Sequence, residues 1–176
     1  MKANMMKPRF FLPLLTAFFS APLWAASATI EIEIPQLQVA EYHRPYIALW
    51  IEDEAKKTHA QLAVWYDIAM KNDEGKEWLK DLRQWWRRGG RDLDLPADGV
   101  SSATRPAGKH RVQFGADHPA LQTLKPGKYL LFAEASREVG GREVVKIPFQ
   151  WPPKEQQSLN AKGERELGAV ILTLQP

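Results

Sequence analysis

The stretch "GKYLLFAEASREVGGREVVKIPFQW" (residues 127–151) contains two runs rich in aromatic and β-branched residues, separated by Gly140-Gly141. A two-residue Gly-Gly connection between such runs is a strong signal for a β-hairpin. Pro148 lies inside the second run, and proline cannot donate a hydrogen bond to a strand ladder. The stretch therefore predicts an antiparallel hairpin whose second strand ends early or lies at the edge of a sheet.

Outside this hairpin, the chain reads as short strands with turn residues between them. "TIEIEI" alternates strictly, as a half-buried strand does, and the other runs are rich in aromatic and β-branched residues. Further strands are expected at 29–34, 46–53, 60–68, 108–114 and 166–174. The polar stretch 152–164 is expected to be a connector. About seven strands at this spacing predict a mainly β protein, an immunoglobulin-like antiparallel β-sandwich without the immunoglobulin disulfide.

One segment, "GKEWLKDLRQWWRRGG" (75–90), departs from the strand pattern. Its apolar residues recur at helical spacing, and Gly89-Gly90 provides a stop, so one Trp-rich amphipathic helix is expected over 75–88. The stripe consists of Trp78, Leu79, Leu82, Trp85 and Trp86. Such a stripe usually packs against the core. A compatible interpretation leaves one tryptophan at the rim of a cofactor pocket, with Trp85 and Trp86 as the candidates for stacking.

The first 28 residues have the layout of a secretory signal peptide, with three basic residues, an apolar run and a small-residue end. Cleavage is expected between about Ala25 and Ala28, which leaves 29–176 as a single exported, periplasmic domain. Without the leader, 21 basic residues balance 21 acidic ones, so the charge gives no reason to expect a nucleic-acid partner. The absence of cysteine excludes disulfides, thiolate metal sites and the Cys-based attachment of haem.

The loop "DGVSSATRP" (98–106) is small and rich in hydroxyl groups. Its ordinary interpretation is a solvated turn before a strand, because Ser, Gly and Asp favour turns. A second interpretation makes Thr104 a site of covalent attachment, since its small neighbours would let the hydroxyl group approach a bound pyrophosphate closely. Arg105, the next residue, is then a candidate partner for a phosphate.

Four residues of this loop, Asp98, Ser101, Ala103 and Thr104, resemble the flavinylation motif of exported FMN-binding domains. The resemblance implies that Thr104 carries FMN through a phosphoester bond, installed from FAD by a periplasmic flavin transferase. Ser102 stands where that family usually has glycine. A serine there would be strained if the position required a positive φ.

The chain from about residue 29 to 174 also resembles a family of predicted periplasmic proteins of unknown function. The stretches that carry this resemblance are "YIALWIED", "EWLKDLRQWW", "SSATRPAGKHRV" and "LKPGKYLLFAEASRE". Members of that family tend to be encoded near PepSY-domain membrane proteins and flavin transferases. The resemblance therefore implies an extracytosolic electron-transfer role with these two kinds of partner.

The sequence thus leads to one functional expectation and one alternative. The expected function is a periplasmic electron-transfer protein with FMN on Thr104, an electron carrier or accessory protein rather than a stand-alone enzyme. The residues expected at the cofactor are Thr104, Asp98, Ser101, Ala103, Arg105, Trp85 and Trp86. The alternative is a cofactor-free sandwich module that binds or scaffolds a membrane protein. No metal site is expected, because the histidines at 43, 59, 110 and 118 are scattered.

Overall fold

The computed structural model describes residues 26–55 and 57–176. Residues 1–25, and with them almost all of the predicted signal peptide, lie outside the described residues. The first strand begins at Ser27, inside the range in which cleavage is expected. None of the helices in the described part of the chain is both long and apolar enough to span a bilayer.

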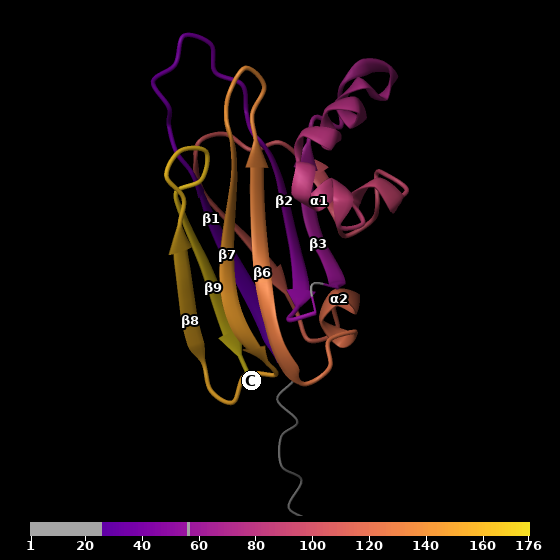
Figure 1. Ribbon diagram of the computed structural model, residues 1–176, viewed down its shortest axis with the longest axis vertical. Coiled ribbons are helices and arrows are strands. Elements are labelled where there is room, and N and C mark those ends of the chain that lie inside the picture. Colours follow the sequence, from indigo (N-terminus) through magenta and orange to yellow (C-terminus); the bar gives the residue numbers. More distant parts are fainter. Residues whose placement is uncertain (1–25, 56) are drawn as a thin grey trace, which may run out of the picture.

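The described residues form two β-sheets that face each other, so the prediction of a mainly β sandwich is confirmed (Figure 1). The strands are β1 Ser27–Ile34, β2 Tyr46–Asp53, β3 Thr58–Tyr66, β4 Ser101–Ala103, β5 Gly108–Phe114, β6 Gly127–Ser136, β7 Arg142–Trp151, β8 Gln157–Lys162 and β9 Ala169–Gln175. One sheet has the order β5-β1-β9-β8, and the other has the order β4-β3-β2-β6-β7. All neighbouring strands are antiparallel except β3 and β4, which are parallel.

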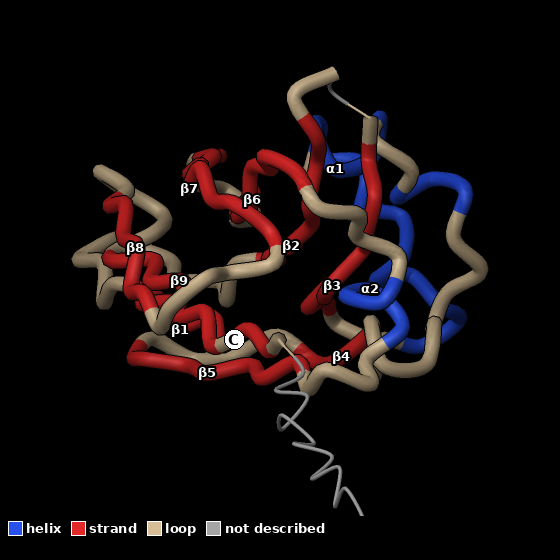
Figure 2. Tube along the Cα trace, turned by 90° about the horizontal axis from the view of Figure 1, so that it is seen from below, coloured by secondary structure: helices blue, strands red, loops and turns tan. Residues whose placement is uncertain are grey.

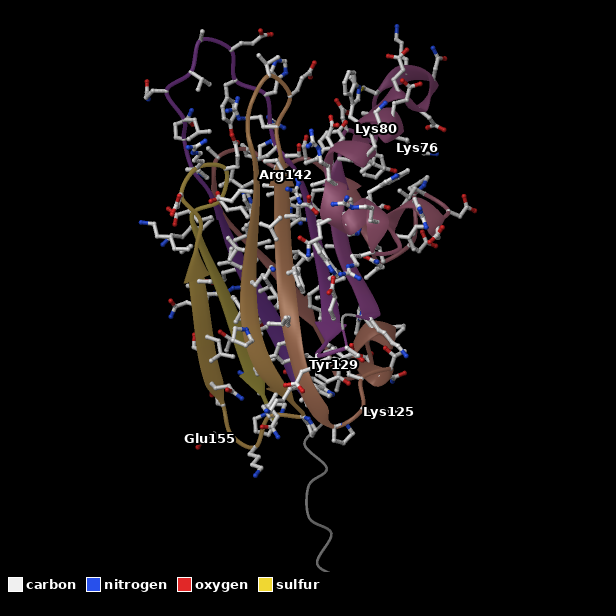
Figure 3. The ribbon with its side chains drawn as sticks, viewed as in Figure 1. Lys76, Lys80, Lys125, Tyr129, Arg142 and Glu155 are labelled. Atoms are coloured by element: carbon white, nitrogen blue, oxygen red, sulfur yellow. The ribbon has the colours of Figure 1, made fainter. Side chains whose placement is uncertain are left out.

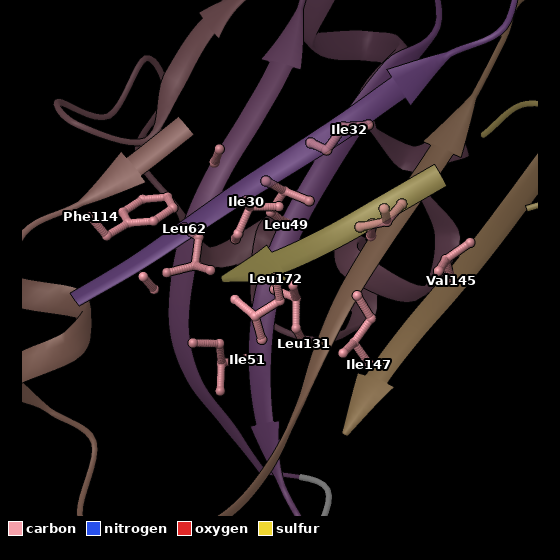
Figure 4. Close-up of a cluster of buried hydrophobic side chains, with 14 of the residues drawn as sticks. Ile30, Ile32, Leu49, Ile51, Leu62, Phe114, Leu131, Val145, Ile147 and Leu172 are labelled. Atoms are coloured by element: carbon pink, nitrogen blue, oxygen red, sulfur yellow. The ribbon is translucent and has the colours of Figure 1, made fainter. Parts of the chain in front are cut away.

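The main hydrophobic core lies between the two sheets (Figure 4). In β1 every second residue is buried, so Ile30 and Ile32 face the core while Glu31 between them is partly exposed. Leu131 of the facing sheet and Leu172 of β9 belong to the same cluster. The strict alternation in the sequence therefore reports a strand with one face in the core and one toward solvent.

The five-stranded sheet is covered on its second face as well, by a helical segment (Figure 2). This segment consists of a 3-10 helix η1 Lys71–Asp81, a short helix α1 Arg83–Arg87 and a 3-10 turn η2 Gly90–Asp92. Its buried side chains pack on Trp50 and Phe132, whose rings stack 4.8 Å apart. Burial on both faces explains why "YIALWIED" reads as a continuous apolar run.

The single helix predicted over 75–88 is wrong, because the chain breaks at Leu82, with φ −74° and ψ 68°. Leu82 has no side-chain oxygen to cap the N-terminus of α1. The carboxylate of Glu134, on β6, does so from the sheet and accepts the backbone N–H groups of Gln84 (3.1 Å) and Trp85 (2.7 Å). Gly89 ends α1 with φ +105°, at the stop that the sequence predicted.

Three further details differ from the sequence-based prediction. The connector expected at 152–164 contains the edge strand β8, whose polar residues face solvent, and residues 101–103 of the predicted loop form β4. The predicted hairpin is confirmed, but its turn spans 137–141 rather than two residues. Within this turn the backbone N–H of Arg137 donates to the carbonyl oxygen of Gly141 at 3.1 Å, and the Arg137 side chain forms a buried ion pair with Glu166, with Nε and Oε2 2.9 Å apart.

Candidate functional site

The loop that carries the predicted attachment site is held against the five-stranded sheet. Residues 101–103 pair in parallel with 64–66 of β3, and the backbone N–H of Thr104 donates to the carbonyl oxygen of Tyr66 at 3.2 Å. Upstream, the hydroxyl group of Ser101 accepts the backbone N–H of Ala97 at 3.0 Å. Backbone and side-chain hydrogen bonds therefore fix the position of Thr104 relative to the sheet.

Ser102 adopts the extended conformation of β4 and has no positive φ. The residue of this loop with a positive φ is Gly99, at +72°. Serine in place of glycine therefore introduces no backbone strain at position 102. The departure from the usual motif is compatible with the backbone that this chain adopts.

Thr104 lies in the wall of a pocket of about 510 Å³ at one end of the sandwich. The loop β1–β2, the segment after β3, η1, the segment after β4 and the β6–β7 hairpin all contribute to it. The lining residues are Tyr42, His43, Arg44, Tyr46, Asp67, Ala69, Met70, Trp78, Asp81, Ala103, Thr104, Ser136 and Glu138. In Figure 1 the loops at this end lie at the top, opposite α2 (Pro119–Gln122). The lining residues thus come from four separate stretches of the chain, 42–46, 67–81, 103–104 and 136–138.

The structure brings together only part of the predicted site. Thr104 is partly buried and lines the pocket beside the exposed Ala103. Asp98 is an exposed turn residue, and Ser101 supports the turn; neither belongs to the pocket wall. Arg105 also lies outside that wall, with its guanidinium 4.1 Å from the ring centroid of Trp65. Partial burial there lowers the pKa of Arg105.

The two tryptophans predicted to stack on a cofactor do not line the pocket. Trp85 is 0% exposed, and its indole N–H donates to Oε1 of Gln61 at 2.8 Å. Trp86 is partly buried and packs against the same second core. Both rings serve the packing of the helical segment on the sheet.

Trp78 occupies the rim position that the sequence assigned to one of these tryptophans. Its side chain is 44% exposed and lines the pocket. On a regular helix Trp78 shares a face with Leu82 and Trp85, but the 3-10 geometry of η1 and the break at Leu82 turn it outward. No sequence pattern singles out Tyr42 and Arg44 of the β1–β2 loop, because only the tertiary structure brings them to Thr104.

A close backbone contact holds Trp78 in this position. Gly75 packs so tightly on the segment after β3 that an added Cβ would lie 1.9 Å from the carbonyl oxygen of Asp67. The side chain of Asp67 also accepts the backbone N–H of Ala69, at 3.2 Å. Only glycine allows η1 to approach the sheet this closely.

We expect Gly75→Ala to displace η1 and Trp78 while the sandwich stays folded. The overlap is with backbone rather than with a flexible side chain, so η1 has to shift. The fluorescence of Trp78 and the near-ultraviolet circular dichroism should change, whereas the far-ultraviolet β signal should not. Gly99→Ala is a matched control, since a Cβ there meets nothing within 4 Å and tests only the cost of a positive φ. Identical spectra for Gly75→Ala and wild type would contradict the contact.

Two phenols and a histidine ring are among the polar groups of the pocket wall. Burial raises the pKa of Tyr46, and a hydrogen bond with the backbone of Asp67 offsets only part of this effect, so the phenol stays neutral. The hydroxyl group of Tyr42 is buried and has no hydrogen-bond partner among the described residues. The His43 ring lies between its neighbour Glu41 and the β6–β7 turn: Nε2 is 3.0 Å from Oε1 of Glu41 without hydrogen-bond geometry, and Nδ1 is 3.4 Å from Oε2 of Glu138.

The side chains that line the pocket determine which kind of ligand it can bind. The rings of Tyr42, Tyr46 and Trp78 offer flat surfaces, and Met70 adds an apolar contact. The guanidinium of Arg44 could pair with a phosphate or a carboxylate. Among the described residues, no three His, Asp or Glu side chains gather in a way that would hold a metal ion. The aromatic lining suits a flat organic group, and Arg44 would favour an anionic end of it against the three carboxylates of the wall, Asp67, Asp81 and Glu138.

A model of the family described as "Predicted periplasmic protein (DUF2271)" matches residues 27–169 of the chain. This range contains the pocket and eight of the strands, and it ends at the first residue of β9. No curated protein and no solved structure matches the chain.

Proposed function

We propose that this chain, which belongs to the DUF2271 family of predicted periplasmic proteins, is an electron carrier that holds FMN covalently on Thr104. The family description itself supports the periplasmic location. The observation that carries the rest of the proposal is the position of Thr104 in the wall of an aromatic pocket.

The size and lining of the pocket fit a flavin. Its volume of about 510 Å³ lies within the range of roughly 300–1,000 Å³ typical of sites for small molecules and cofactors. Trp78, Tyr42 and Met70 supply surface for a planar, largely apolar ring system. The unpaired phenol of Tyr42 is a polar group that a heteroatom of a ligand would satisfy.

The attachment step balances without any oxidant or reductant. In that step the Thr104 oxygen would form a new bond to the FMN-side phosphorus of FAD, and the pyrophosphate P–O bond would break to release AMP. The hydroxyl proton passes to a base of the transferase. Ala103 and Ser102 leave space around the hydroxyl group, and the edge position of β4 leaves this side of the sheet unpaired.

The residues of this chain would then hold the group in place. Arg44, the one guanidinium among the described residues of the pocket wall, would neutralise the phosphodiester, and the rings of Trp78 and Tyr42 would flank the bound group. When bound, FMN supplies reversible one- and two-electron redox chemistry, and the protein supplies position and electrostatics. The proposed partners are a flavin transferase for the attachment and a PepSY-type membrane protein for the electron transfer.

A cofactor-free module that binds a membrane protein remains the second candidate. The observation that favours it is the placement of Arg105, whose guanidinium lies on Trp65 rather than at the pocket. In this alternative the pocket end would be a recognition surface, and Thr104 would serve only as a turn residue. The two candidates differ in whether the mature protein acquires a chromophore.

The deciding experiment is the intact mass of the mature protein after co-expression with a flavin transferase in a periplasm. We expect a mass increase equal to FMN less one water, yellow colour, and a modified peptide that contains Thr104. The same preparation without the transferase is the control and should be colourless. An unmodified mass, with the transferase active on a known substrate, would contradict the proposal and favour the cofactor-free module.

A further inference from the structure

Exposed apolar side chains gather at the pocket end of the sandwich. In the described part of the chain, the exposed large hydrophobic residues are Val39, Ile68, Met70, Trp78 and Val139. They come from the β1–β2 loop, the segment after β3, η1 and the β6–β7 turn, which are the segments that surround the pocket. Val139, at the tip of the hairpin, is 77% exposed and has φ +51°. Clustering of this kind on one end indicates a surface that contacts something else.

The charges around the same pocket are predominantly negative. Its wall contains three carboxylates, Asp67, Asp81 and Glu138, and one guanidinium, that of Arg44. Glu41 lies beside His43, which also contacts Glu138. Figure 3 shows Lys76 and Lys80 on η1 at this end. Lys76 is already paired with Asp73, with Nζ and Oδ2 3.0 Å apart. A phosphodiester on Thr104 would add a further negative charge.

The exposed apolar side chains and the negative charge limit which kind of partner can bind to the pocket end of the sandwich. An anionic bilayer would bring negative headgroups against the carboxylates, and a second copy of this chain would oppose like charges across the contact. A protein surface with an apolar centre and basic side chains around it meets both features favourably. Small apolar contacts with complementary charged rims are also typical of weak redox complexes, which have to form and separate quickly.

We infer that the pocket end docks a redox partner through a basic surface on that partner, around an apolar contact that includes Trp78 and Val139. The inference rests on the proposed function, since a group on Thr104 has to be reached at this end. The partner is defined by its chemistry, as a protein with clustered lysine or arginine side chains at its own redox centre.

The test uses a lysine-rich c-type cytochrome as the basic probe and an acidic blue copper protein as its counterpart. The ¹⁵N-labelled mature protein is titrated with each, both as the flavin-loaded wild type and as the flavin-free Thr104→Val variant. At low salt the cytochrome should shift signals confined to the pocket end, including the indole N–H of Trp78. The apparent affinity should fall by roughly tenfold or more between low and physiological salt, as electrostatically steered contacts do.

Matched variants distinguish the effect of carboxylates at the pocket end from the effect of the overall charge of the protein. Asp81→Asn with Glu138→Gln should weaken the binding of the cytochrome at least threefold at low salt. Glu54→Gln with Glu155→Gln removes the same charge elsewhere and should leave it unchanged; Glu155 lies at the opposite end in Figure 3. Val139→Ser should weaken binding at every salt concentration, because it removes apolar contact rather than charge.

Several outcomes would overturn the inference. These are shifts away from the pocket end, affinity independent of salt, stronger binding of the acidic protein, or binding to phosphatidylglycerol vesicles that removes the Trp78 signal. Failure of the proposed function is a separate result, since the intact mass reports the flavin and the flavin-free variant reports docking without it.

Discussion

Replacing Thr104 by valine should abolish flavin attachment and leave the fold intact. Valine has nearly the shape of threonine and lacks the hydroxyl group on which the phosphoester depends. The hydrogen bond that Thr104 makes to Tyr66 uses the backbone, so the substitution does not remove it. The intact mass of Thr104→Val, co-expressed with the transferase, should be that of the unmodified chain, and the protein should be colourless.

Two controls make this result specific to Thr104. Thr104→Ser keeps a hydroxyl group at the same position and should retain at least part of the label. Ser102→Ala removes the neighbouring hydroxyl group of β4 and should leave labelling unchanged. Thermal unfolding of the three variants should match wild type closely. A full label on Thr104→Val would place the attachment elsewhere and refute the assignment.

Replacing Glu134 by alanine should cause the largest loss of stability among single substitutions outside the main core. This carboxylate is fully buried, caps α1 through Gln84 and Trp85, and accepts Nε of Arg142 at 2.5 Å. Removing one partner of a buried charged network typically costs about 3–5 kcal/mol. For a domain of this size the melting temperature should fall by roughly 6–20 °C.

Two further variants should distinguish the stability lost with the helix cap from the stability lost with the charge of Glu134. Glu134→Gln keeps one acceptor oxygen and should lose about half as much stability. Glu54→Ala removes an exposed carboxylate paired with Lys128 and should change the free energy of unfolding by less than about 0.5 kcal/mol. The fluorescence of the buried Trp85 should shift in Glu134→Ala, because its helix loses its cap. A melting temperature equal to that of wild type would show that α1 is held by its apolar contacts alone.

The strands could be predicted where the pattern reflects burial on one face or a hairpin signal. The alternation of "TIEIEI" and the Gly140-Gly141 connection led to β1 and to the β6–β7 hairpin. β8 was missed because it is an edge strand with alternate residues in solvent, and its composition resembles that of a loop. β4 was missed because three residues carry too little pattern, and its pairing partner lies on a strand some 40 residues earlier.

Only some of the residues predicted at the cofactor site lie together in the structure. Thr104 and Ala103 reach the pocket, whereas Trp85, Trp86 and Arg105 pack elsewhere. Helical periodicity correctly marked an aromatic stripe, but it could not show that the stripe breaks at Leu82. After that break, the N-terminus of α1 is capped by Glu134, from a strand about 50 residues later.

The sequence by itself determined the class of the fold, because alternation and turn residues encode which face of each strand is buried. It also supplied the hypothesis about Thr104, because a short motif is local in the chain. The tertiary structure alone decided which tryptophan stands beside Thr104, which loops enclose it, and which end of the molecule carries exposed apolar and acidic side chains. These features depend on contacts between segments far apart in sequence, and the local sequence pattern does not show which distant segments come into contact.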